Sequence, residues 1–276
     1  MRLLVFGLSG QVGDALRVRL LESGQQVLAV SRQVRASEPG VDWIAGSLQA
    51  MPTLPDGLDA VLSLGPLDAF ADWFAAAAPH GLRVIALGST GRVDKRDSSD
   101  PLERALADRL QTAERLLFEA ARARGAAVTV LRPTLLYGNG RDRSLTPLVA
   151  LARRWRVVPL PWSAQGRRQP VHVDDVAGAV LACLHAPATA GQAYDLPGAE
   201  TLAFDAMVRR ALAVHAPGSR VLRLPWPVFD LALWLAGRVG IADGSAGALD
   251  RLSRDQVADA GPASSAFGWA ARGFVP

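Results

Sequence analysis

The chain has 276 residues, of which 50% are hydrophobic and 20% are charged, and its formal net charge is +4. This composition excludes a disordered chain and supplies enough apolar side chains for one large domain, or for a domain with a smaller lobe. Lys95 is the only lysine, and the arginines that make up the other basic residues are scattered, which argues against a nucleic-acid-binding surface.

Cysteine content and hydropathy bear on the cellular compartment. Cys183 is the only cysteine, so no intramolecular disulfide can form, and we expect a buried thiol in a reducing compartment. The most apolar stretch, residues 224–242, is interrupted by Asp230 and Arg238, whereas a membrane span needs ~20 uncharged apolar residues. We therefore expect a cytoplasmic protein.

Apolar runs typical of strands alternate with patterns typical of helices. The expected strands are Arg2–Phe6, 26–30, 42–45, 59–64, Arg83–Leu87, 127–131 and 193–196. The expected helices are 11–23, 67–78, Pro101–Arg124, 145–154 and 174–186. Strands separated by helices form a parallel sheet covered on both faces, so the predicted class is a doubly wound α/β fold.

A glycine-rich turn, Gly-Leu-Ser-Gly-Gln-Val-Gly at residues 7–13, joins the first strand to the first helix. Gly7 permits the tight bend, Gly10 lets the backbone approach a pyrophosphate, and Gly13 lets the helix pack closely on the strand. The helix N-terminus, at Gln11 and Val12, offers N–H groups to the phosphates. The pattern predicts a dinucleotide site; the alternative is a tight turn without a ligand.

The residues after the second strand bear on which dinucleotide binds. A carboxylate there would accept from the ribose 2′-OH of NAD. Instead the chain has Ser31 and Arg32, with no acid until Glu38. Serine and arginine suit a 2′-phosphate, so NADP(H) is favoured over NAD(H). Alternatively, Arg32 is an exposed loop residue.

The alternation of strands and helices loosens after residue 157, where proline and tryptophan become frequent. We interpret residues 1–156 as a dinucleotide-binding domain. Residues 157–276 are expected to form a smaller substrate-binding lobe that is partly interleaved with the sheet.

Further motifs follow in a fixed order. They are Leu-Gly-Ser-Thr at 87–90, Leu-Arg-Pro-Thr-Leu-Leu-Tyr-Gly at 131–138, Arg-Gln-Pro-Val-His-Val-Asp-Asp-Val-Ala at 168–177, Tyr-Asp-Leu-Pro-Gly at 194–198 and Phe-Gly-Trp at 267–269. With the glycine turn, this set resembles the NAD(P)-dependent epimerase/dehydratase family of extended short-chain dehydrogenases/reductases, in particular its nucleoside-diphosphate-sugar epimerase-like members. The resemblance implies a Rossmann fold, a nicotinamide cofactor and a small-molecule substrate, anionic or a nucleotide-sugar.

The family's catalytic tyrosine, four residues before a lysine, has no counterpart here. Neither Tyr137 nor Tyr194 is followed at that spacing by Lys95, the only lysine. Aligning residues 113–117 with the family's helix puts Asp108 at the tyrosine position and Thr112 at the lysine position. Ordinary family chemistry is therefore not expected.

The resemblance implies roles for six other residues. Thr90 would hydrogen-bond a substrate oxygen, or else cap the strand end. Tyr137 would be the phenolic acid, or else a half-buried aromatic with a satisfied hydroxyl. Arg168 would hold a substrate diphosphate, or else be a solvated surface arginine. The remaining implied cofactor contacts are Ser47, Leu64 and Gly65.

Residues 172–175 have simpler interpretations than catalysis. His172 is expected to be a core histidine hydrogen-bonded to a carbonyl, and Asp174 and Asp175 to cap the following helix. The four histidines lack paired spacing, so no metal site is expected.

The sequence therefore favours an NADP(H)-dependent reductase or epimerase-like oxidoreductase with an atypical active site. The alternative is a non-catalytic NADP(H)-binding sensor or structural subunit. A membrane or partner role for residues 226–238 is less favoured than core packing. Relatives suggest a homodimer formed through 67–78 and 101–124.

Overall fold

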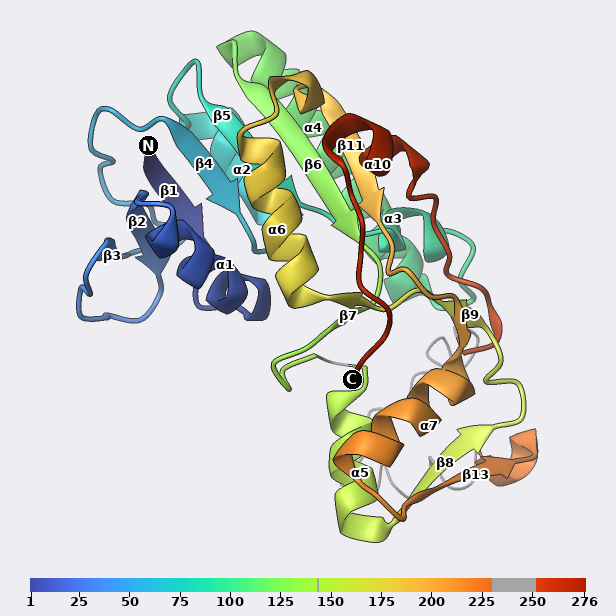
Figure 1. The fold of residues 1–276 in the computed structure, drawn as a ribbon. Coiled ribbons are helices and arrows are strands. Elements are labelled where there is room, and N and C mark those ends of the chain that lie inside the picture. The colour runs from blue at the N-terminus through green and yellow to red at the C-terminus, as the bar shows by residue number, and fades with distance from the viewer. Residues whose placement is uncertain (143, 230–251) are drawn as a thin grey trace.

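The computed structural model describes residues 1–142, 144–229 and 252–276, and its central element is a parallel sheet (Figure 1). The strands lie in the order β11-β6-β5-β4-β1-β2-β3, and every neighbouring pair is parallel. Their bounds are β1 Arg2–Phe6, β2 Gln26–Ser31, β3 Val41–Ala45, β4 Ala60–Ser63, β5 Arg83–Leu87, β6 Ala127–Pro133 and β11 Gln192–Leu196. All seven expected strands are present.

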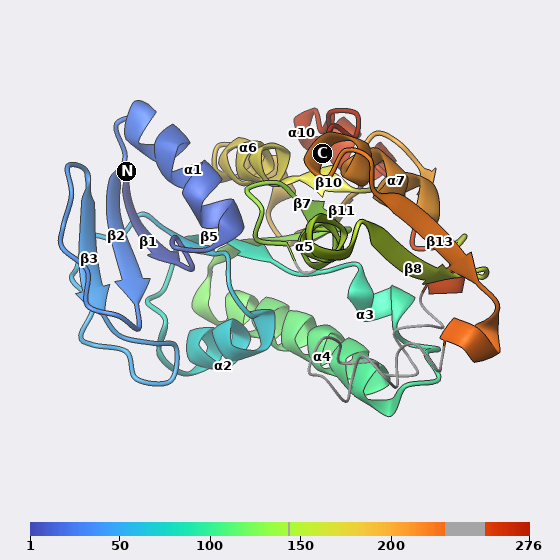
Figure 2. The same cartoon turned by 90° about the horizontal axis from the view of Figure 1, so that it is seen from below.

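Helices cover both faces of this sheet, which confirms the doubly wound α/β class (Figure 2). One face carries α1 (Gln11–Glu22), α6 (Val173–Leu184) and α10 (Gly261–Phe267), and the other carries α2 (Leu67–Ala77) and α4 (Pro101–Arg124). The strands between them are apolar on both sides: every residue of β4 is buried. Two apolar cores result, one on each face.

Local sequence signals explain the ends of α4. The side chain of Asp100 accepts a hydrogen bond of 2.9 Å from the backbone N–H of Leu102, and Pro101 occupies the first turn, where its missing N–H costs nothing. Gly125 ends the helix in the left-handed conformation, with φ 61°.

A smaller unit lies beyond the carboxyl ends of the strands (Figure 1). Its elements are α5 (Thr146–Trp155), β8 (Val157–Pro161), α7 (Phe204–His215) and β13 (Arg220–Leu224). Short elements complete the described fold: α3 Gly91–Asp94, β7 Leu136–Tyr137, β9 Arg167–Arg168, β10 Val171–His172, η1 Pro187–Thr189 and β12 Leu202–Ala203.

The chain passes between the two units more than once. Helix α5 lies before the expected boundary at 156/157, yet its residues Val149 and Ala152 pack in the core of the smaller unit. Conversely, α6 and β11 lie after that boundary and belong to the large sheet. The smaller unit is thus built from residues on both sides of the expected division.

The apolar segment 226–238 falls largely on residues 230–251, which lie outside the described residues. Of its two described aromatic residues, Trp226 is 44% exposed and Phe229 is 4% exposed. None of the helices within the described ranges is both long and apolar enough to span a bilayer. The expected dimer through α2 and α4 stays a prediction.

Candidate functional site

The glycine turn has the close backbone packing that its sequence predicts. Gly7 has a φ of +79°, in the region that favours glycine. A Cβ atom at residue 13 would lie 2.3 Å from the carbonyl oxygen of Leu8, so only glycine fits where α1 meets the turn. A Cβ atom on Gly10 would lie 3.0 Å from the Gly7 carbonyl oxygen.

The first turn of α1 is not capped by a side chain. Its N-cap is Gly10, and the first helical hydrogen bond runs from Asp14 N to the Gly10 carbonyl oxygen at 2.8 Å. The N–H groups of Gln11, Val12 and Gly13 therefore precede the helical ladder, as an anion site requires.

Open space lies next to this turn. A Cβ atom on Gly65, at the end of β4, would meet nothing within 4 Å. The Oε1 atom of Gln11 is buried and has no hydrogen-bond partner among the described residues. The residues at the turn thus fit the pyrophosphate of a dinucleotide, and Gly65 borders the approach.

The ends of β2 and the following loop carry mixed charges. Ser31 is 8% exposed and its Oγ accepts from Gln33 N at 3.1 Å, whereas Arg32 is exposed. Glu38 is already engaged, because Arg17 Nη1 lies 2.6 and 2.9 Å from its two oxygens. This hydrogen bond holds the pKa of Glu38 below its usual value.

The other predicted cofactor contacts lie in two loops. Ser47 forms a tight turn with Ala50, whose backbone N–H donates to the Ser47 hydroxyl at 3.0 Å. Leu64 donates from its backbone nitrogen to Phe6 at 2.9 Å, which holds the end of β4 against the glycine turn. Their contact with a cofactor stays a prediction.

A cavity of about 510 Å³ opens beside the glycine turn. Its lining combines hydroxyl, amide and charged groups with two leucines: Gln11, Ser89, Thr134, Leu135, Leu136, Arg141, Asp142 and Ser144. Of these, only Gln11 was expected as a site residue. Ser89 lies at the same carboxyl end of β5 as Thr90, to which the resemblance assigned the substrate contact, and it is Ser89 that lines the cavity.

Thr90 lies beside this cavity but is not among its lining residues. It is 8% exposed, its hydroxyl hydrogen-bonds the Asp94 carboxyl, and its backbone N–H donates to the Pro133 carbonyl oxygen at 3.4 Å. Burial raises the pKa of Asp94 above its usual value. The role of Thr90 toward substrate stays a prediction.

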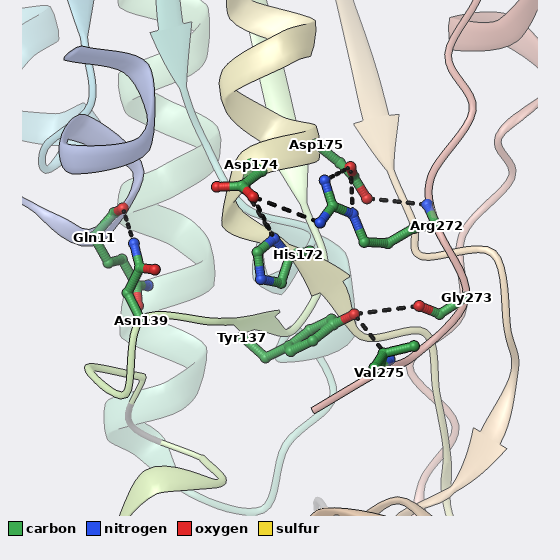
Figure 3. Close-up of polar contacts among 9 residues, drawn as sticks. All are labelled: Gln11, Tyr137, Asn139, His172, Asp174, Asp175, Arg272, Gly273 and Val275. Atoms are coloured by element: carbon green, nitrogen blue, oxygen red, sulfur yellow. Dashed lines mark hydrogen bonds and ion pairs between the residues drawn. The ribbon is translucent and has the colours of Figure 1, made fainter. Parts of the chain in front are cut away.

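Tyr137 is held by the C-terminal end of the chain (Figure 3). Its hydroxyl donates to the Gly273 carbonyl oxygen at 3.4 Å and accepts from the Val275 N–H at 3.3 Å. The residue is 2% exposed, its ring packs edge-on against His172 and Phe274, and burial raises the pKa of the phenol. The hydroxyl is satisfied, as in the expected alternative, but the ring is buried and not half-buried.

Two expectations about residues 172–175 are wrong. The cap of α6 is His172, whose Nδ1 accepts from the backbone N–H of Asp174 at 3.2 Å, so its partner is not a carbonyl. Burial lowers the pKa of this imidazole, and its Nδ1 also lies 3.4 Å from Oδ2 of Asp174. Asp174 and Asp175 instead form ion pairs with Arg272, at 3.5 and 2.8 Å.

Arg168 is not a solvated surface residue, because it is 3% exposed. Its guanidinium donates to the carbonyl oxygens of Arg167 and Arg254 at 2.8 and 2.7 Å and lies 5.7 Å from the ring centre of Phe204. Its contact with a substrate anion stays a prediction.

The residues aligned with the family's catalytic pair face solvent. Asp108 and Thr112 are exposed on α4, and they line a different pocket from the cavity at the glycine turn. The side of α4 that faces inward carries Glu114, which pairs with Arg92 at 3.0 Å and with Arg132.

Within the described ranges, no three His, Cys, Asp or Glu side chains come together in a way that could hold a metal ion.

The chain is similar to known proteins over most of its length. Residues 71–196 match the model of the NAD dependent epimerase/dehydratase family. A 2-alkyl-3-oxoalkanoate reductase of Stenotrophomonas maltophilia is 30% identical over 257 residues, which cover 79% of this chain and 77% of the relative. The chain belongs to the NAD-dependent epimerase/dehydratase family. Within this family it is similar to both epimerases and reductases.

Two further proteins are similar to this chain, one in its fold and the other over a short stretch of sequence. MoeE5 in complex with UDP-glucose and NAD superposes with a TM-score of 0.72 at 20% identity, covering 100% of this chain and 95% of that one. Subunit 9 of the NADH dehydrogenase 1 alpha subcomplex of Dictyostelium discoideum is 30% identical over 77 residues, which are 28% of this chain and 21% of the subunit. The first likeness shows the fold alone.

Proposed function

We propose that this family member is an NADP(H)-dependent reductase of a small carbonyl compound. The observation that carries the proposal is the uncapped glycine turn opening on the cavity of about 510 Å³. The cavity joins hydroxyl groups to apolar walls, which suits a carbonyl group on an aliphatic chain. The similar reductase from Stenotrophomonas maltophilia supports this substrate class.

The chemistry that a bound nicotinamide supplies is the transfer of a hydride to or from the substrate carbon. Reduction of a carbonyl group also needs one proton at its oxygen, and in our proposal this proton comes from water that enters through the open cavity. In our proposal the N–H groups at the start of α1 bind the pyrophosphate. The hydroxyl of Ser89 at the end of β5 lines the cavity and donates to the carbonyl oxygen, and the hydroxyl of Thr90 joins it by exchanging the Asp94 carboxyl for the substrate. Leu135 and Leu136 exclude water from the reacting carbon.

We assign Tyr137 a positioning role in place of the proton transfer expected from the family. Its proton is engaged with Gly273, and its hydroxyl oxygen accepts from Val275. It therefore holds the C-terminal segment against β7. Arg168 is proposed to face the anionic end of the substrate from the smaller unit.

Two features support NADP(H) over NAD(H). Arg32 is exposed after β2 and free to approach a 2′-phosphate, and Glu38 is engaged by Arg17. A carboxylate bound to an arginine is a poor acceptor for the ribose 2′-OH of NAD.

The decisive test is a pair of turnover assays: NADPH oxidation followed by its absorbance with a 2-alkyl-3-oxo acid, and epimerisation of UDP-glucose in the presence of NADP+ followed by chromatography of the sugar nucleotide. The proposal predicts oxidation with the oxo acid, lost in Ser89→Ala/Thr90→Ala. Turnover with UDP-glucose alone would contradict the substrate class.

A second candidate function is a dinucleotide-binding subunit without turnover. It is favoured by the missing tyrosine–lysine spacing and by the local likeness to the NADH dehydrogenase subunit. Binding of NADPH with no turnover in either assay would support it against the reductase.

A further inference from the structure

The segment 138–142, which follows β7, contacts the glycine turn and contributes to the lining of the cavity. Its backbone bends sharply, because Gly138, Asn139 and Gly140 have φ angles of 111°, 56° and 59°. The Nδ2 atom of Asn139 then donates to the Gln11 carbonyl oxygen at 3.4 Å (Figure 3). This bend directs the next side chain of the segment, Arg141, toward α1.

Arg141 makes two contacts at the start of α1. Its Nη2 donates to the carbonyl oxygen of Ser9 at 2.9 Å, and its Nη1 lies 2.5 Å from Oδ2 of Asp14. Arg141 also lines the cavity. Its guanidinium thus lies beside the N–H groups that precede the helical ladder of α1.

We propose that Arg141 is a further cofactor-positioning residue, whose guanidinium contacts the pyrophosphate of a dinucleotide bound at the glycine turn. Asp14 holds the guanidinium at the turn before the dinucleotide binds. The inference rests on the proposed dinucleotide binding and adds to it a cation that the glycine motif does not contain.

The exchange of partners is physically easy. The side chains of Arg141 and Asp14 are 49% and 43% exposed, and an ion pair at such exposure contributes little. Phosphate oxygens match the planar guanidinium in a bidentate geometry and carry more charge than one carboxylate. The guanidinium therefore gains by leaving Asp14 for the pyrophosphate.

The test is calorimetric titration of the whole chain with two probes. ADP-ribose carries the pyrophosphate without nicotinamide, and adenosine carries no phosphate. The variants are Arg141→Gln, Asp14→Asn and the double variant. The matched control is Arg115→Gln, which removes the same charge from an exposed site on α4.

We expect Arg141→Gln to weaken ADP-ribose binding roughly tenfold, as loss of a charge-assisted contact does, and to leave adenosine binding unchanged. Asp14→Asn should tighten ADP-ribose binding about threefold by freeing Arg141, and this gain should shrink in the double variant.

Two results would overturn the role of Arg141 and leave the cofactor proposal standing. The first is equal ADP-ribose affinity in Arg141→Gln and Arg115→Gln. The second is that Asp14→Asn tightens ADP-ribose binding equally in the unmodified protein and in Arg141→Gln. Failure of the unmodified protein to bind ADP-ribose would overturn the cofactor proposal as well. The two failures are thus distinguishable.

Discussion

The hydroxyl of Tyr137 accepts a hydrogen bond of 3.3 Å from the backbone nitrogen of Val275, 138 residues later in the chain. The same hydroxyl donates to Gly273. The only tyrosine near the candidate site is therefore bonded to backbone, and its phenol fastens the last residues of the chain to β7.

Replacing this tyrosine separates anchoring from catalysis. Tyr137→Phe should lower the free energy of unfolding by about 1 kcal/mol, the usual contribution of such a hydrogen bond, while turnover stays within about twofold of the unmodified protein. Urea denaturation and the NADPH oxidation assay measure the two effects. Tyr194→Phe is the control, because Tyr194 lies in β11 and its ring packs on Phe267 of α10, away from the candidate site. A hundredfold loss of turnover with unchanged stability would make Tyr137 the acid.

Two glycines at the turn should respond differently to alanine. Gly13→Ala places a Cβ atom 2.3 Å from a carbonyl oxygen, so it should destabilise the protein by about 3 kcal/mol or more. A Cβ atom at residue 65 would have nothing within 4 Å, so Gly65→Ala should change the free energy of unfolding by less than about 0.5 kcal/mol. Its affinity for NADPH should nevertheless fall, because the added methyl group lies in the space for the cofactor. Unchanged NADPH affinity in Gly65→Ala would show that the loop after β4 does not contact the cofactor.

Glu114 should be important for stability. It is 8% exposed and lies between Arg92 and Arg132, so Glu114→Ala leaves two poorly solvated cations and should cost about 3 kcal/mol. Glu119→Ala, which removes a 58% exposed partner of Arg115 on the same helix, should cost less than about 0.5 kcal/mol. If Glu114→Ala and Glu119→Ala lost the same free energy of unfolding in thermal or urea denaturation, the buried pairing of Glu114 would be contradicted.

His172 should make stability depend on pH. Burial lowers its pKa in the folded state, so the unfolded chain binds the proton more tightly. The contribution of the neutral imidazole to the free energy of unfolding is complete above about pH 6.5, the pKa of histidine in the unfolded chain. It is lost as the pH falls from there through the lower pKa of the folded state. The stability difference between the unmodified protein and His172→Gln should therefore shrink below pH 6.5. A difference that is constant between pH 5 and pH 8 would show that His172 does not titrate on unfolding.

Local patterns predicted the sheet because its strands are short apolar runs that alternate with segments of helical pattern. The expected bounds of Pro101–Arg124 match α4 because Asp100, Pro101 and Gly125 mark both ends. Helix α7 was not expected, although its buried residues Phe204, Met207, Val208 and Ala211 have helical spacing. Its own first turn has no side-chain cap, so no start signal precedes it.

The site was predictable only where one short segment determines it. The glycine turn can be recognised from residues 7–13 alone, and the structure shows the close backbone packing that these residues predict. The contact of Arg141 with Asp14 joins residues 127 positions apart, and that of Asp175 with Arg272 joins residues 97 apart. No local spacing encodes such contacts. They also explain why capping was wrongly expected of Asp174 and Asp175, whose carboxylates pair with the C-terminal segment.

The central claim is that a dinucleotide binds at the glycine turn and that Arg32 selects its 2′-phosphate. The direct measurement is calorimetric titration of the unmodified protein and of Arg32→Glu with NADPH and NADH side by side. The account predicts tighter binding of NADPH by the unmodified protein and a loss of that preference in Arg32→Glu. Tighter binding of NADH, or no binding of either nucleotide, would contradict it.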